Sequence, residues 1–193
     1  LAACQACLLY EGAREVGGEG PTPCDWLFLA EGPGALEDKL GRPLVGPSGR
    51  LLARLLLLAD LSREEVRLDN VVRHRPPANR KPRASEMRAC SHWTELEFIR
   101  QVPKVVVTLG ATSLSFLAPK LKLESEHGIA REWVWHGQPF LLVPWYHPAA
   151  ALRDPEKMAI VVGDARRLRG EIERARRPVM PTVYRLGKPE DAI

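Results

Sequence analysis

The chain has 193 residues, 45% of them hydrophobic and 27% charged, which suits one folded domain and excludes intrinsic disorder. No run approaches the roughly 18 uncharged apolar residues of a membrane helix, and the opening LAACQACLLY lacks the basic start of a signal peptide, so we expect a cytoplasmic protein with no membrane partner. The 28 Lys and Arg residues outnumber the 24 Asp and Glu residues, and the net charge of +4 is compatible with a phosphate-bearing partner.

Apolar strand-like runs alternate with stretches of helical periodicity along the chain. In chain order, we expect strands over residues 26–30, 66–72, 105–109 and 140–145, with helices between them over 48–59, 85–99 and 111–117. Such alternation is typical of parallel strands joined by right-handed helical crossovers. The predicted fold class is α/β, a single-domain three-layer α/β/α sandwich with a mainly parallel central sheet.

Two details complete the predicted architecture. A His-Gly-Gln-Pro turn at residues 136–139 separates two strand-like runs, which predicts a hairpin that adds an antiparallel edge to the sheet. The last helix is expected from Pro155 to about residue 177, before Pro178. We therefore assign residues 1–178 to one domain and residues 179–193 to an extended C-terminal tail.

The carboxyl ends of the predicted strands are the expected place for a ligand, because open α/β sheets bind ligands there. The segments that follow those strands are residues 31–38, 70–83, 110–113 and 147–153. We expect the chemistry of the protein to lie among them.

Four cysteines occur, as a C-x-x-C pair at Cys4 and Cys7 and as the separate Cys24 and Cys90. This usage favours metal or redox chemistry over a disulfide framework in a cytosolic protein. A zinc site, an iron–sulfur cluster and two buried thiols stay open from the spacing alone. A thioredoxin-like redox pair is disfavoured because the C-x-x-C precedes the first strand.

An ordered series of motifs runs along the chain. Its members are Cys4-x-x-Cys7, Glu31-Gly32-Pro33-Gly34 with Glu37-Asp38, Gly41-Arg42-Pro43-Leu44-Val45-Gly46-Pro47-Ser48-Gly49, Asp69-Asn70-Val71-Val72, Arg75-Pro76-Pro77-x-Asn79-Arg80, Cys90, Leu109-Gly110-Ala111 and His147-Pro148-Ala149. Over about residues 4 to 175 this series resembles the family 4 uracil-DNA glycosylases. The resemblance implies a glycosylase that extrudes uracil from single- or double-stranded DNA into a closed pocket.

The resemblance also implies a 4Fe–4S cluster, normally held by four cysteines. One of those positions is occupied here by His74, and histidine can ligate iron in iron–sulfur proteins. The expected ligands are therefore Cys4, Cys7, His74 and Cys90. Cys24 is the competing fourth ligand, and His74 could instead be a solvated member of a basic loop.

Within the implied base pocket, Asn70 presents a donor and an acceptor to the uracil edge, and His147 donates to uracil O2 as the catalytic histidine. Glu37 is the expected water-orienting carboxylate, with Glu31 as a second acid of the pocket. A solvated first-turn acid is the alternative interpretation of Glu37, and a turn-capping residue that of Asn70. The remaining implied uracil-binding residues are Leu44, Gly32 and Gly34.

Leu44 departs from the family, which usually has a Phe that stacks on the flipped base. Leucine gives contact without stacking, so we expect weaker uracil binding or an altered base preference, and a gain of uracil activity in Leu44→Phe. In the loop over residues 147–153, Leu152 is the only large residue that could fill the gap left by the base, and such a weak wedge favours single-stranded or mismatched uracil. The expected DNA contacts are Arg73, Arg75, Arg80, Lys81, Arg83, Leu152 and Arg153. Cations of the last helix alternate with acids, as on a solvated helix face.

The sequence thus predicts a monomeric DNA repair glycosylase that hydrolyses the N-glycosidic bond of uracil and leaves an abasic site. The alternatives are a non-catalytic iron–sulfur protein that binds DNA or senses damage, and a glycosylase with shifted base preference. A uracil-crosslinking relative is disfavoured because the basic insert carrying the crosslinking histidine is missing. An electron-transfer protein is disfavoured by the distant spacing of the ligands.

Overall fold

The computed structural model describes residues 4–176, and a five-stranded sheet with the strand order β2-β1-β3-β5-β4 forms its centre. The strands are β1 (Trp26–Ala30), β2 (Val66–Asn70), β3 (Val105–Leu109), β4 (Arg131–Trp135) and β5 (Gln138–Trp145). β2, β1, β3 and β5 are parallel, and β4 pairs antiparallel with β5 at the edge. The predicted mainly parallel α/β sheet is confirmed.

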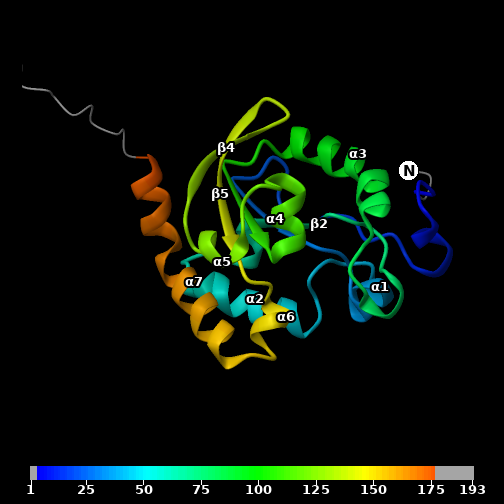
Figure 1. Cartoon of the computed structure of the whole chain (residues 1–193), viewed down its shortest axis with the longest axis horizontal. Coiled ribbons are helices and arrows are strands. Elements are labelled where there is room, and N and C mark those ends of the chain that lie inside the picture. Colours follow the sequence, from blue (N-terminus) through cyan, green and yellow to red (C-terminus); the bar gives the residue numbers. More distant parts are fainter. Residues whose placement is uncertain (1–3, 177–193) are drawn as a thin grey trace, which may run out of the picture.

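Helices cover both faces of this sheet (Figure 1). They are α1 (Ala35–Leu40), α2 (Pro47–Leu58), α3 (Ala84–Gln101), α4 (Ala111–Leu117), α5 (Leu123–Glu126), α6 (Pro148–Ala151) and α7 (Pro155–Arg176), with 3-10 turns η1 (Leu8–Gly12), η2 (Arg63–Glu65) and η3 (Pro77–Asn79). Because side chains alternate along a strand, Phe28 packs toward α2, α6 and α7, whereas Leu27 and Leu29 pack toward α3, α4 and α5. The two buried layers make the predicted three-layer sandwich.

The expected hairpin is present, with its turn at His136 and Gly137. Both residues have positive φ, 47° and 78°, as the turns that suit the twist of paired strands require. None of the helices between residues 4 and 176 combines the length and the apolarity needed to cross a membrane.

The element boundaries differ from expectation in a few places. β2 ends at Asn70 rather than at residue 72, and the six-residue α1 and the four-residue α5 and α6 were not predicted. Segments under two helical turns are too short to show a periodic pattern. The expected end of the last helix at residue 177 and the tail over 179–193 lie outside the described residues, and the domain assignment stays a prediction.

The parallel register brings the ends of the strands together. Ala30 lies opposite Asn70 in the β1–β2 pair, and Leu109 lies opposite Trp145 in the β3–β5 pair. The segments that follow β1, β2, β3 and β5 therefore leave the sheet at one edge, which is where the sequence places the candidate chemistry.

Candidate active site

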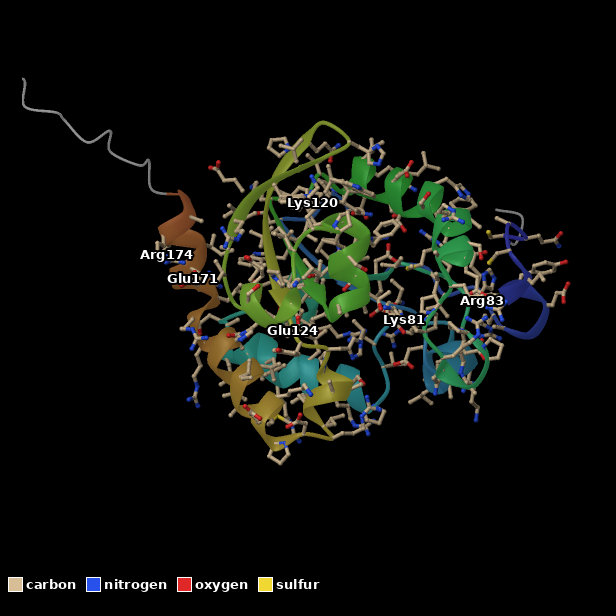
Figure 2. All side chains as sticks on the ribbon, viewed as in Figure 1. Lys81, Arg83, Lys120, Glu124, Glu171 and Arg174 are labelled. Atoms are coloured by element: carbon tan, nitrogen blue, oxygen red, sulfur yellow. The ribbon has the colours of Figure 1, made fainter. Side chains whose placement is uncertain are left out.

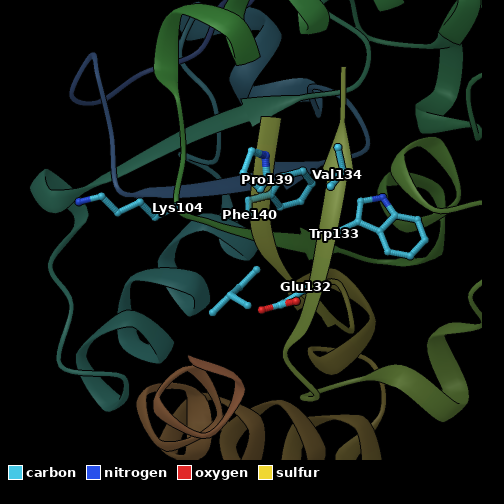
Figure 3. A pocket seen from close by; sticks show the side chains of 7 residues that line it. Lys104, Glu132, Trp133, Val134, Pro139 and Phe140 are labelled. Carbon is cyan, nitrogen blue, oxygen red and sulfur yellow. The ribbon is translucent and has the colours of Figure 1, made fainter. Parts of the chain in front are cut away.

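Two hollows in the described structure are candidates for a site. The larger, about 750 Å³, runs along β4 and β5 and is lined by Lys104, Glu132, Trp133, Val134, Pro139, Phe140 and Leu141 (Figure 3). The smaller, about 580 Å³, lies at the carboxyl ends of the parallel strands and is lined by Glu31, Glu37, Asn70 and His147 among others. Convergent polar groups, rather than size, identify the second hollow as the candidate active-site cleft.

Asn70 ends β2 with its side chain in the cleft and is only 3% exposed. Its backbone N–H donates to the carboxylate of Asp69 over 2.8 Å. Within residues 4–176 the side-chain Nδ2 is buried and has no hydrogen-bond partner. Because an unpaired buried N–H is costly, this donor is preorganised for a ligand that brings an acceptor.

His147 follows β5 and caps the first turn of α6. Its Nδ1 accepts the backbone N–H of Ala149 over 3.0 Å. Burial, and after it the positive charge of Arg153, lowers the pKa of His147 to about 4, against a weaker opposing effect of Glu37. The ring is therefore neutral at pH 7, and since Nδ1 accepts, the proton lies on Nε2 and is available for donation.

The close approach of His147 to β3 depends on Gly110. This residue has a φ of 94°, and a Cβ placed on it would lie 3.2 Å from the Cβ of His147. A side chain at position 110 would therefore both strain the backbone and displace the histidine.

Glu37 lies in the first turn of α1 and is 9% exposed. Its Oε1 accepts the backbone N–H groups of Val45 over 3.0 Å and of Gly46 over 2.8 Å. The interpretation of Glu37 as a solvated first-turn acid is wrong, because the side chain turns inward to hold the loop that follows α1. Its Oε2 packs against Gly34, where a Cβ would come within 2.8 Å.

Glu31, directly after β1, faces the same cleft and accepts a hydrogen bond from the hydroxyl of Thr112 at the start of α4. Gly32 and Gly34 line the cleft beside it. Thr112 is 4% exposed and was not named as a site residue from the sequence. Thr112 lies within the segment 110–113, which follows a predicted strand, and this position could have indicated that it is a site residue.

Leu44 also lines the cleft, 5% exposed, with a left-handed backbone at a φ of 51°. Its side chain also packs into the core between the sheet and α2. The structure thus brings Leu44 together with Asn70, Glu37 and His147, although their positions span more than a hundred residues of sequence.

Several expected DNA contacts surround the mouth of the cleft. Arg80, Lys81 and Arg153 line it, although Arg80 also forms an ion pair with Glu86 over 2.6 Å. Lys81 and Arg83 project from the segment leading into α3, across the molecule from Glu171 and Arg174 on α7 (Figure 2). On α7, Glu171 pairs with Arg174 and Asp164 with Arg167. The expected solvated face does not include Asp164, which is 0% exposed and also contacts His127. Leu152 is 47% exposed.

Arg73 does not share this exposed position. It is 8% exposed, its guanidinium lies 5.5 Å from the centre of the Trp93 ring, and it approaches Glu15 and Glu97 at 3.8 Å and 3.9 Å. A side chain held inside the protein in this way is not placed to contact phosphate. The expectation that Arg73 binds DNA is therefore corrected, whereas Arg75, whose Nε donates to Asn79, stays at the surface.

The cysteine region comprises Cys4 and Cys7 near the start of the described chain and Cys90 in α3. The indole N–H of Trp93 donates to the sulfur of Cys4 over 3.1 Å, and the backbone N–H of Arg73 donates to the sulfur of Cys90 over 3.4 Å. Burial raises the pKa of Cys90 to about 11, and the nearby Cys7 and Cys4 add to that shift. These three thiols therefore share one region.

His74 follows Arg73 and is 3% exposed, so it is not a solvated member of the basic loop. Cys24 is buried elsewhere, where burial raises its pKa to about 11 and its charged neighbours are Arg67 and Asp25. Between residues 4 and 176 no three His, Cys, Asp or Glu side chains are close enough together to hold a metal ion. The three thiols are nevertheless the ligand type that an iron–sulfur cluster requires. The N–H groups that donate to their sulfur atoms are also typical of such sites.

The chain is similar in sequence to known proteins over most of its length. The profile of the uracil DNA glycosylase superfamily matches residues 18–173. The chain is 38% identical to a type-4 uracil-DNA glycosylase of Saccharolobus solfataricus over 86% of this chain and 80% of the relative. It is 38% identical to that of Thermotoga maritima over 89% and 90%, and 32% identical to that of Archaeoglobus fulgidus over 93% of each.

Proposed function

The chain belongs to the uracil DNA glycosylase superfamily, and from this we propose that it extrudes uracil from DNA and hydrolyses its N-glycosidic bond, leaving an abasic site. The observation that carries the proposal is the pairing of two preorganised donors in one cleft. These are the Nδ2 of Asn70, which has no hydrogen-bond partner among residues 4–176, and the Nε2 proton of a neutral His147.

Base recognition is assigned to Asn70 and Leu44. The buried amide of Asn70 offers a donor to O4 and an acceptor to N3–H of uracil, a pattern that cytosine does not match. Leu44, which lines the same cleft, would contact the face of the base. A leucine side chain lacks the base–aromatic stacking that is worth ~1–3 kcal/mol per base, so excision of a different base is the second candidate activity.

Bond cleavage is assigned to His147 and Glu37. As the glycosidic bond breaks, negative charge gathers on the uracil ring, and a neutral imidazole that donates from Nε2 stabilises it without a competing proton transfer. The sugar develops positive charge, which the carboxylate of Glu37 would stabilise while it orients the attacking water. Glu31, with Thr112 as donor, completes the polar wall.

DNA binding is assigned to the cations around the mouth of the cleft. Arg75, Arg80, Lys81, Arg83 and Arg153 would contact phosphates, and Leu152 would fill the space that the extruded base leaves. Because Leu152 is a small wedge, single-stranded or mismatched uracil should be the better substrate.

The cysteine region would hold a 4Fe–4S cluster on Cys4, Cys7, Cys90 and His74. Its contribution is structural, since it would tie the N-terminal segment to the loop before α3 and place the cations of that loop. The grouped thiols and the buried imidazole support this assignment, and the separate location of Cys24 disfavours it as the fourth ligand.

The proposed function is tested by incubating the purified protein with labelled single- and double-stranded oligonucleotides that contain uracil, followed by alkaline cleavage and a denaturing gel. We expect strand scission at uracil, with faster scission of the single strand. Intact uracil DNA despite retained DNA binding would contradict the assignment. Scission at another base instead would establish the shifted preference.

A further inference from the structure

The loop that carries Leu44 is held from two sides. On the inner side the carboxylate of Glu37 accepts the N–H groups of Val45 and Gly46. On the outer side the guanidinium of Arg63 donates to the two preceding carbonyls, that of Leu44 over 2.9 Å and that of Pro43 over 2.8 Å. The carboxylate of Glu37 and the guanidinium of Arg63 thus hold consecutive peptide groups of the same loop in place.

The backbone at Leu44 needs such support. A φ of 51° lies in the left-handed region, which residues other than glycine seldom occupy. The carbonyl oxygen of Leu44 also packs closely against Gly49, where an added Cβ would come within 1.8 Å of that oxygen. A loop in this conformation persists only where surrounding contacts stabilise the strained backbone, and such loops concentrate at functional sites.

Arg63 is itself anchored to the strand that carries Asn70. Its guanidinium pairs with Glu19 over 3.3 Å. The backbone of Glu19 forms two hydrogen bonds with Leu68 in β2, of 2.9 Å and 2.8 Å, and Leu68 precedes Asn70 by two residues. Arg63 and Glu19 therefore link the wall that contacts the face of the base to the strand that reads its edge.

We propose that Arg63 is a positioning residue for the base pocket, where its guanidinium, held by Glu19, sets the distance between Leu44 and Asn70. This inference rests on the proposed function, because it takes the Leu44 wall to contact the flipped base. Arg63 is not among the described residues that line the cleft, and it acts through the backbone of Pro43 and Leu44.

The chain offers a matched control in Arg42. Its guanidinium also binds Glu19, with Nε at 2.7 Å from the carboxylate, but it is 61% exposed and within residues 4–176 donates to no backbone carbonyl. Arg63→Ala and Arg42→Ala thus each remove a cation from Glu19, and Arg63→Ala alone removes the donors to the pocket wall.

The test is the inhibition constant of free uracil, measured in the excision assay on single-stranded DNA, together with kcat and KM. Arg63→Ala should raise the inhibition constant and KM roughly tenfold, as expected for hydrogen bonds from a charged donor, with a smaller change in kcat. Arg42→Ala should change them less than about twofold. Equal effects of the two substitutions would overturn the proposal.

A double-mutant cycle separates positioning from general stability. If Arg63 acts through Leu44, Arg63→Ala should add little to the cost of Leu44→Ala. Additive costs would overturn the proposal, as would a fall in activity that only follows the melting temperature. Should Arg63→Ala fail to fold, Arg63→Lys, which keeps the charge but not the two-pronged donor, should give an intermediate inhibition constant. Wild-type protein that fails to excise uracil would instead overturn the proposed function.

Discussion

Two regions of this protein each contain a histidine whose pKa is lowered chiefly by desolvation, His147 in the cleft and His74, which follows Arg73 in the chain. The neighbours of the two rings differ. Nδ1 of His147 is fixed by the N–H of Ala149, and its ring shares a cleft with Asn70, whereas His74 follows Arg73, whose N–H donates to Cys90. Burial alone therefore does not assign a role. The ring of His147 can donate a hydrogen bond from Nε2 within the cleft, whereas the role proposed for His74 depends on the cluster proposed above.

The largest effect should come from removing the donor in the cleft. His147→Asn keeps a side-chain acceptor for the N–H of Ala149 but does not place a donor where Nε2 lies. We expect the single-turnover excision rate to fall about 10²–10³-fold, the usual cost of one such donor, with little change in melting temperature. A rate within about threefold of wild type would show that His147 is not the donor.

The carboxylate of Glu37 provides the next test. Glu37→Gln keeps an oxygen that can accept the N–H groups of Val45 and Gly46 but removes the negative charge. If the charge orients water and stabilises the sugar cation, excision should slow by about 10²-fold. Unchanged single-turnover kinetics in a folded variant would restrict Glu37 to holding the loop.

The histidine of the cysteine region should behave differently. His74→Ala should lower the iron content per protein chain while the residual folded protein loses less activity than His147→Asn does. Cys24→Ala is the matched control, because Cys24 is equally buried but lies apart from the other thiols. Full iron retention in His74→Ala would remove His74 from the ligand set, and iron loss in Cys24→Ala would place Cys24 there.

The smallest effect is the pH dependence of the cleft. His147 titrates near its usual pKa of 6.5 when unfolded and near 4 when folded, so the unfolded chain binds more protons between these values. Its contribution to stability is fully present above pH 6.5 and is lost as the pH falls toward 4. Thermal unfolding across this range should show a shallower pH slope for His147→Asn, and a parallel slope would contradict the shift. The excision rate should show no inflection near pH 6.5.

Much of the fold could be predicted from sequence because it depends on local pattern. The continuous apolar runs of β1 and β3, the periodicity of α2 and α3 and the turn at His136 each carry their signal within a few residues. The order of motifs likewise indicated Asn70, His147 and Glu37 as pocket residues. Sites that follow parallel strands meet at one sheet edge whatever the length of the crossovers between them.

Other features were decided by tertiary contacts. Arg73, surrounded in sequence by other cations, is buried against Trp93, Glu15 and Glu97, which come from distant segments. Glu37 turns inward to accept the N–H of Gly46, and Arg63 donates to the carbonyl of Leu44. The local sequence does not indicate that these side chains bind backbone groups. The sequence by itself determined the strands of the sheet, the longer helices and the types of reactive side chain. The tertiary structure decided which charges face solvent and which hold the pocket, because desolvation and long-range hydrogen bonds act only once the chain has folded.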